Sequence, residues 1–198
     1  MRYTEVPCFA FLKWIIESRH FGDRDRYSAC LHCLTVSEMH EFSIREATSP
    51  DYPALGNIMF EAVRNGTPQY TEAQRVAWAP EPRSGIEWHN RLNSLTVFLA
   101  ESRESPLGFM ALANDYVDLA YILPVARGSG MFRGLYNEIE ASAHGNGVKR
   151  LWTHASLTAQ TAFSAVGFCT TTKETVKIGD VPLDRFEMEK HLVTPVAE

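Results

Sequence analysis

The stretch Pro124-Val125-Ala126-Arg127-Gly128-Ser129-Gly130-Met131-Phe132-Arg133 decides the fold of this chain. An apolar run over 117–123, typical of a buried strand, precedes it, and apolar residues at helical spacing follow it. The sequence therefore predicts a strand, a glycine-bearing turn and a helix. The first N–H groups of a helix have no intrahelical partner and carry partial positive charge, so this turn suits a phosphate.

Two common phosphate-binding motifs do not fit the stretch. A Walker loop requires a Lys after its last glycine, and no Lys follows here. A dinucleotide-binding fingerprint fits Gly128 and Gly130, but Arg133 stands where its third glycine is required. The stretch is therefore either a phosphate-binding turn of another kind or a strand-to-helix turn with a purely structural role.

Composition limits the classes of protein that this chain can belong to. Its 198 residues are enough for one domain with an ordinary core. A net charge of −5, from 19 Lys and Arg against 24 Asp and Glu, argues against general nucleic-acid binding. No apolar run is long enough for a transmembrane helix, and the N-terminal apolar cluster 9–16 contains Lys13 and lacks a cleavage site. We expect a cytoplasmic protein without a membrane partner.

Residues 1–40 differ from the rest of the chain. They hold Cys30 and Cys33, whose spacing is that of half a zinc site or a redox pair, but no second half with recognisable spacing is present. We expect reduced cysteines and no metal. Residues 1–40 are interpreted as an N-terminal extension of unknown role, or as an upstream extension of the reading frame. Residues 41–192 are interpreted as the main domain and 193–198 as a tail.

Hydrophobic periodicity and turn residues predict the order β-α-α-α-β-β-β-α-β-α-β-β. Helices are expected to begin at Ser49, at a capping box over 71–74, at a second capping box over 84–87, and after Gly130. A last helix is expected over Ser156–Val166. The expected strands are 41–45, 96–101, 107–112, 116–123, 151–153, 170–177 and 183–190.

This order, with a glycine turn after the fourth strand, resembles the GNAT family of N-acetyltransferases over residues 41–191. The turn is similar to the Arg/Gln-x-x-Gly-x-Gly/Ala motif of that family. Residues 116–124 resemble its fourth strand, residues 155–168 its last helix with the Gly-Phe exit, and residues 70–79 the acceptor-side helix of a poorly characterised bacterial branch. The resemblance implies an α/β fold, with a mixed sheet of six to seven strands and helices on both faces.

The resemblance also implies acetyl-CoA as co-substrate. The backbone around Ile122 and Leu123 would pair with its pantetheine arm, and Ser156 would hydrogen-bond that arm or cap a helix. The turn would hold the pyrophosphate through Arg127, Gly128, Ser129, Gly130, Met131, Phe132 and Arg133.

Two residues depart from the family pattern. Phe132 stands where the motif has Gly or Ala, so its ring either points away from the cofactor or crowds the helix start. Phe163 stands where many relatives have a Tyr that protonates the leaving thiolate, and a phenyl ring donates no proton. Tyr121, solvent or the adjacent helix end would have to stabilise the thiolate instead.

Acetyl transfer to an amine requires a base, because an ammonium has no lone pair. Asp118 lies in an otherwise apolar strand, where burial would raise its pKa, and His154 ends the fifth strand. Either is a candidate base, and either is alternatively a residue that contacts a loop. The N–H of Ile122 would stabilise the carbonyl oxygen. Cys169 offers a covalent route, but nothing nearby marks it as activated.

The acceptor is expected to be an amine on a small molecule, attacked directly in a ternary complex. Tyr70, Trp78 and Trp88 either line an aromatic wall or belong to the core, and His89 lies on a helix surface or contacts substrate. The alternative function is an acyl-CoA-binding sensor with weak catalysis. The family often dimerises, so a homodimer is possible.

Overall fold

A computed structural model describes residues 42–103 and 105–193. Several predictions lie outside these residues: the N-terminal extension, its Cys30–Cys33 pair, its apolar cluster and most of the C-terminal tail.

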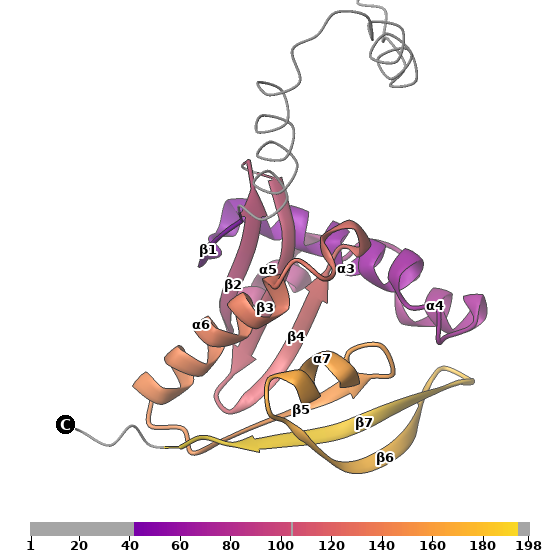
Figure 1. Cartoon of the computed structure of the whole chain (residues 1–198). Helices are drawn as coiled ribbons and strands as arrows, with labels where there is room; N and C mark the ends of the chain where they lie inside the picture. The colour runs from indigo at the N-terminus through magenta and orange to yellow at the C-terminus, as the bar shows by residue number, and fades with distance from the viewer. Residues whose placement is uncertain (1–41, 104, 194–198) are drawn as a thin grey trace, which may run out of the picture. The chain divides into compact units, whose positions relative to one another are not determined.

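The described residues form a seven-stranded mixed sheet in the order β1-β2-β3-β4-β5-β7-β6, with helices on both faces (Figure 1). The predicted fold class is therefore confirmed. No helix in the described ranges is long and apolar enough to cross a membrane. The strands are β1 Ser43–Glu46, β2 Thr96–Ser102, β3 Ser105–Ala113, β4 Tyr116–Ile122, β5 Arg150–Ser156, β6 Cys169–Ile178 and β7 Val181–His191. The helices are α3 Tyr52–Gly66, α4 Glu72–Trp78, α5 Gly85–Asn93, α6 Met131–Gly145 and α7 Gln160–Ala165, with short 3-10 turns η1 Ser49–Asp51 and η2 Pro124–Ala126.

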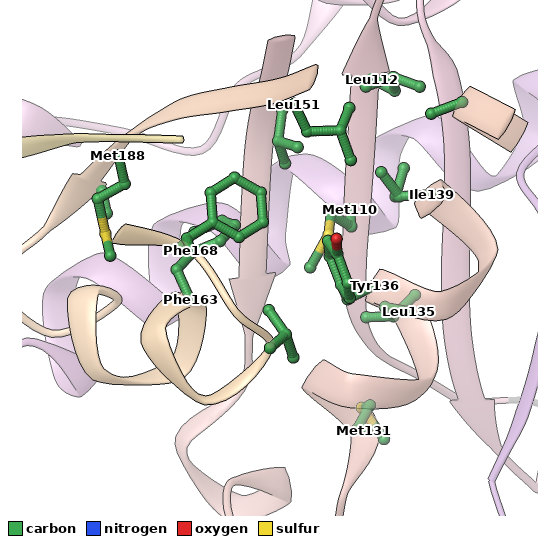
Figure 2. Packing of buried hydrophobic residues seen from close by; sticks show 14 of the residues in the cluster. Met110, Leu112, Met131, Leu135, Tyr136, Ile139, Leu151, Phe163, Phe168 and Met188 are labelled. Atoms are coloured by element: carbon green, nitrogen blue, oxygen red, sulfur yellow. The ribbon is translucent and has the colours of Figure 1, made fainter. Parts of the chain in front are cut away.

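Each face of the sheet carries its own hydrophobic core. On one face, α6 presents Met131, Leu135 and Ile139, the stripe predicted from helical spacing, to Met110 of β3 and Phe163 of α7 (Figure 2). On the other face, α3 and α5 pack on the alternate side chains of β2 and β3. Because neighbouring strand residues point to opposite faces, β2 and β3 serve both cores and are buried on both sides.

The parallel strands β4 and β5 lie together at one end and then diverge (Figure 1). Their Cα pairing is limited to Tyr116 and Trp152. A side-chain bond from Thr153 Oγ1 to Val117 O, at 2.9 Å, closes the same end. Along its other edge, β5 pairs with β7 over its whole length, from Arg150 to Ser156. The divergence opens a gap in the hydrogen-bonded layer in the middle of the sheet.

Helix starts differ from the sequence prediction at three places. Thr71 and Gln74 form the predicted capping box, but Ser84 makes no capping bond, and α5 begins with Gly85 at a φ of 75°. The turn before α3 is capped through Asp51, whose carboxylate accepts from the Thr48 N–H at 2.8 Å, and not by Ser49. Ser156 ends β5, and α7 begins four residues later than expected, at Gln160.

Arg45 and Asp51 join β1 to the start of α3. Both terminal nitrogens of Arg45 donate to the Asp51 carboxylate at 2.8 Å. This pairing holds the pKa of Asp51 well below its usual range. A carboxylate with a lowered folded-state pKa stabilises the protein above its ordinary pKa, near about 4, and loses that contribution as the pH falls further.

We expect Asp51→Asn to lower the free energy of unfolding by about 1 kcal/mol near neutral pH, because the pair is lost and Arg45 is partly exposed. The difference from wild type should narrow at about pH 3, because there the Asp51 carboxylate of the unfolded wild-type chain is protonated while that of the folded chain is not. Denaturant unfolding at both pH values measures this. Asp180→Asn, in the exposed turn between β6 and β7, is the control. If Asp51→Asn lowered the free energy of unfolding equally at both pH values, the stabilising role assigned to the Asp51 carboxylate would be wrong.

Candidate active site

A cleft of about 480 Å³ occupies the gap between β4 and β5. Its walls come from both strands, from the turn before α6, from α7 and from the C-terminal end of α3, where Ala62, Val63 and Thr67 lie. Leu123 and Ser129 are not among the lining residues. The predicted residues that line the cleft are Asp118, Tyr121, Ile122, Arg127, Gly128, Gly130, Met131, Phe132, Arg133, His154 and Ser156.

The turn before α6 exposes backbone N–H groups at the cleft. Gly128 and Gly130 have φ of 80° and 86°, in the left-handed region that side chains rarely adopt, and a Cβ on either would meet no atom within 4 Å. The first hydrogen bond of α6 runs from Gly134 N–H to Gly130 O at 3.0 Å. The N–H groups of Phe132 and Arg133 therefore have no intrahelical partner and suit an anion.

The polar side chains of the turn hold it in place. Ser129 Oγ donates to Ala126 O at 2.8 Å, inside the turn. The Arg127 guanidinium donates to Gly66 O, at the end of α3, and its burial lowers the pKa of Arg127. Arg133 donates to Ala165 O, at the end of α7, at 2.9 Å. Both arginines thus anchor the turn to helix C-termini, where a cation is favoured.

The edge of β4 that faces β5 is open beside the cleft. Leu123 N–H donates to Leu107 O at 2.9 Å, and Leu123 O accepts from Ala126 N–H, so the Leu123 backbone groups are occupied. Backbone N–H and C=O groups point to opposite sides of a strand at successive residues. Because the Leu123 N–H points to β3, the N–H and C=O groups of Ile122 and Ala120 point away from β3. Among the described residues no strand lies beside them, so they can pair with an extended ligand.

Phe132 and Phe163 pack on each other in the cleft wall. Their rings meet edge to face, with centroids 5.1 Å apart. Phe163 is buried and also contacts Phe168, while Phe132 packs against the same core. The Phe132 ring therefore joins α6 to α7. At Phe163, the position of the expected acid, the structure places an apolar contact.

Asp118 occupies a β-bulge. Leu112 and Ala111 of β3 pair with Val117 and Leu119, which leaves Asp118 without a partner on β3. The apolar environment expected for its carboxyl group is not found. Arg91 of α5 donates to both carboxylate oxygens, at 2.9 and 3.1 Å, because α5 packs over this end of β4.

His154 lies on β5 between two polar side chains. Its Nδ1 is 3.1 Å from the Tyr116 hydroxyl, and its Nε2 is 3.3 Å from Glu174 Oε1 on β6. Burial, assisted by nearby Arg185, lowers the pKa of His154, while Glu174 acts in the opposite direction. The neutral imidazole is therefore the dominant form near pH 7.

Tyr121 lies on the side of the cleft that faces α3 and α4. Its ring contacts Phe109 and Trp78, with centroids 5.7 and 6.4 Å away. Burial raises the pKa of Tyr121 to about 12. Of the three residues predicted as an aromatic wall, only Trp78 lines the cleft. Trp88 belongs to the core under α3, where its Nε1 donates to a helix carbonyl.

Tyr70 connects segments on the two sides of the diverging strands. Its hydroxyl donates to Asp184 O of β7 at 2.6 Å and accepts from Leu157 N–H at 3.0 Å. Ser156 Oγ accepts from Ala159 N–H at 3.1 Å. These bonds hold the segment after β5 in a turn, which explains why α7 starts late.

The structure adds polar residues that the sequence analysis missed. Arg91, Tyr116 and Glu174 contact predicted residues from which they are distant in the chain. Tyr116 begins the stretch that resembles the fourth strand of the family, but nothing in the sequence marked its hydroxyl as a partner of His154. His89 and Cys169, named as weaker candidates, are not among the residues that line the cleft. Within residues 42–103 and 105–193, no cluster of His, Cys, Asp and Glu is arranged to hold a metal ion.

The diverging strands, the open edge of β4 and the glycine turn define a protein of the acyltransferase type. The sequence model of the Acetyltransferase (GNAT) domain matches residues 67–192. The chain belongs to the GNAT family of acetyltransferases.

Two similar proteins agree with this assignment, and a third shares the fold. The N-acetyltransferase YafP of Escherichia coli K12, itself described as uncharacterized, is 26% identical over 140 residues, which cover 70% of this chain and 89% of YafP. A GCN5-related N-acetyltransferase from Rhodopseudomonas palustris is 26% identical, with a TM-score of 0.72 over 76% of this chain and 95% of its own. The putative acetyltransferase yncA from Salmonella typhimurium, solved with acetyl-CoA, shares the fold at 20% identity, with a TM-score of 0.56 over 80% of this chain and 98% of its own.

Proposed function

We propose that this protein transfers an acetyl or short acyl group from acetyl-CoA to an amine of a small molecule. The observation that carries the proposal is the cleft itself, which runs from the free N–H groups at the start of α6 along the open edge of β4. A phosphate group followed by an extended amide chain suits these two features in that order. The acetyl-CoA in the yncA structure supports this choice of co-substrate.

In this proposal the turn binds the pyrophosphate through backbone N–H groups, from Gly128 to Arg133. The pantetheine arm pairs with the groups of Ala120 and Ile122 that face away from β3. Because the thioester lies at the end of the arm farther from the turn, the Ala120 N–H, in place of the Ile122 N–H expected from the sequence, stabilises the negative charge that develops on the carbonyl oxygen. The acceptor amine enters from the side of Trp78 and Thr67 and attacks the carbonyl carbon directly.

The amine must lose a proton before it attacks. We assign the base to His154, because its neutral form accepts a proton near pH 7. Asp118 is the second candidate, on β4 across the cleft from β5, but its carboxylate is already engaged by Arg91. The leaving thiolate needs a hydrogen-bond donor. Tyr121, whose pKa of about 12 keeps it protonated, is our candidate in place of Phe163.

A catalytically weak acyl-CoA sensor is the second candidate function. The observation in its favour is the buried phenyl ring of Phe163 at the position expected for the acid. A protein of this kind would bind acetyl-CoA through the same cleft and transfer the acetyl group slowly or not at all.

Incubation of the full-length protein with acetyl-CoA and a panel of primary amines tests the proposal. Acetylated amine and free CoA thiol in equal amounts are the expected result. Binding of acetyl-CoA, measured by calorimetry, without transfer to any amine would favour the sensor. An acetylated protein trapped in the absence of amine would overturn direct attack, and Cys169→Ser would show whether that thiol carries the group.

A further inference from the structure

The co-substrate proposed above would occupy two walls of the cleft and leave a third wall free. The turn before α6 would hold the pyrophosphate, and the open edge of β4 would pair with the pantetheine arm. The remaining wall faces α3 and α4 and consists of Ala62, Val63, Thr67, Trp78 and Tyr121. Trp78 and Tyr121 pack with the core under α3, on the opposite side of the sheet from α6. We call these five residues the acceptor wall.

His154 projects from β5 to the same side of the sheet as the acceptor wall. Its neighbour Ala155 belongs to the core under α6, and successive residues of a strand point to opposite faces. The base assigned above and the acceptor wall therefore face the same part of the cleft.

Two aromatic rings form the largest part of the acceptor wall. Trp78 and Tyr121 are half-buried, and their ring centroids lie 6.4 Å apart. A buried ring holds each of them in place. Tyr70 contacts Trp78, with centroids 5.6 Å apart, and Phe109 contacts Tyr121. Because the rings are already fixed, a ligand that packs against them pays little for ordering them. The wall therefore suits an apolar or aromatic group.

The charged side chains that line the cleft are already engaged. Asp118 is the one acidic residue that the described part of the chain places there, and Arg91 donates to both of its carboxylate oxygens. Arg127 and Arg133 donate to helix carbonyls beside the turn, where the pyrophosphate would lie. A second ammonium or a carboxylate on the acceptor would lose water at the acceptor wall without gaining an opposite charge. The wall therefore favours an acceptor whose only charge is that of the reacting amine.

Hydrogen bonds between the two sides of the cleft limit the size of the acceptor. Thr158 Oγ1, after β5, donates to Gln69 Oε1, after α3, at 2.6 Å. The Leu157 N–H donates to the Tyr70 hydroxyl at 3.0 Å. Thr67 and Thr158, at the two ends of this bridge, both line the cleft. A peptide chain laid across the bridge would have to break these bonds, whereas a small molecule would not.

We propose that the acceptor is a small monoamine with an apolar or aromatic body, which packs against Trp78 and Tyr121 with its nitrogen on the His154 side of the cleft. The inference rests on the acetyl transfer proposed above and names the acceptor class. The products from the ammonium form and acetyl-CoA are the N-acetyl amine, free coenzyme A and one proton.

Nitrogen-15 NMR of the indole groups of the full-length protein tests the acceptor class without turnover. Trp78→Phe identifies the Trp78 signal. We expect phenethylamine to shift this signal, with and without coenzyme A, and to leave that of Trp88 unchanged, because the Trp88 Nε1 donates to Tyr52 O in the core.

Two matched pairs of ligands measure the effect of an added charge. Phenylalanine adds a carboxylate to phenethylamine, and putrescine adds a second ammonium to butylamine. Each added charge should weaken binding about tenfold or more. No shift of the Trp78 signal with phenethylamine, or equal binding within either pair, would overturn the proposed acceptor class.

Rates of acetyl transfer provide the second test. Trp78→Ala should lower kcat/KM for phenethylamine about tenfold or more, because the apolar body of the amine loses the surface that buries it. Trp78→Phe keeps a ring and should retain most of the rate. Val76→Ala, at an exposed position of α4, is the control and should match wild type. Binding of acetyl-CoA should stay within about twofold in all three variants, which also shows that they fold.

The outcomes separate this inference from the function on which it rests. Unchanged kcat/KM for phenethylamine in Trp78→Ala, or faster acetylation of a lysine-containing peptide than of phenethylamine, would overturn the acceptor class and leave the acetyltransferase function intact. Failure of the wild type to bind acetyl-CoA would overturn that function, and the amine titrations would still decide whether the acceptor wall binds an apolar monoamine.

Discussion

Gly130→Asp is expected to abolish measurable binding of acetyl-CoA, with a loss of affinity of about 100-fold or more. The substitution places a carboxylate at the start of α6, in the space that a Cβ at Gly130 would enter. There it would repel the pyrophosphate across a few ångströms, where like charges interact by several kcal/mol at a protein surface. Calorimetric titration of the purified protein with acetyl-CoA measures the effect.

Gly130→Asn is the matched control for this experiment. Asn has nearly the same shape as Asp and is equally tolerated at the φ of 86° found at this position. Both variants therefore carry the same backbone strain and differ only in charge. We expect Gly130→Asn to retain binding within about tenfold. Equal affinities in the two variants would show that the turn does not hold the pyrophosphate.

Phe109→Ala is expected to lower the free energy of unfolding by about 3–5 kcal/mol. Phe109 lies on β3, fully buried under α3, and its ring contacts Tyr121. The truncation leaves a cavity that β-sheet residues on both sides cannot fill. For a chain of this length the midpoint of thermal unfolding should fall by roughly 10 °C. Thermal unfolding followed by circular dichroism gives this value.

Ile86→Ala supplies the control for Phe109→Ala. Ile86 is a large aliphatic residue that is 71% exposed on α5, so its truncation removes little buried surface. We expect Ile86→Ala to change the free energy of unfolding by no more than about 0.5 kcal/mol. A loss of stability as large as that of Phe109→Ala would mean that Ile86 is covered by a surface that the described residues do not include. A small effect of Phe109→Ala would contradict the core assigned to the α3 face.

Most of the secondary structure could be predicted because its signals are local. The apolar stripe of α6 and the alternation in β6 and β7 each depend on residues a few positions apart. The boundary between β5 and α7 was wrong because a distant residue decides it. The Tyr70 hydroxyl binds the Leu157 N–H and keeps the next residues out of the helix.

The candidate site was predicted in part, and its limits have the same origin. The glycine turn was found because two glycines and a helix start stand together in the chain. The pairing of Asp118 with Arg91, 27 positions away, has no local signal. The sequence placed Asp118 in an apolar strand, but a bulge and the last turn of α5 give it a cation as partner.

The sequence by itself determined the order of the elements, the position of the phosphate-type turn and the departure at Phe163, because each is set by residue types at neighbouring positions. Only the tertiary structure decided where β4 and β5 separate, which backbone groups remain free between them, and that Tyr116 and Glu174 meet His154. These features depend on strand register and on the packing of distant segments, where a shift of one residue would send each side chain to the opposite face of the sheet.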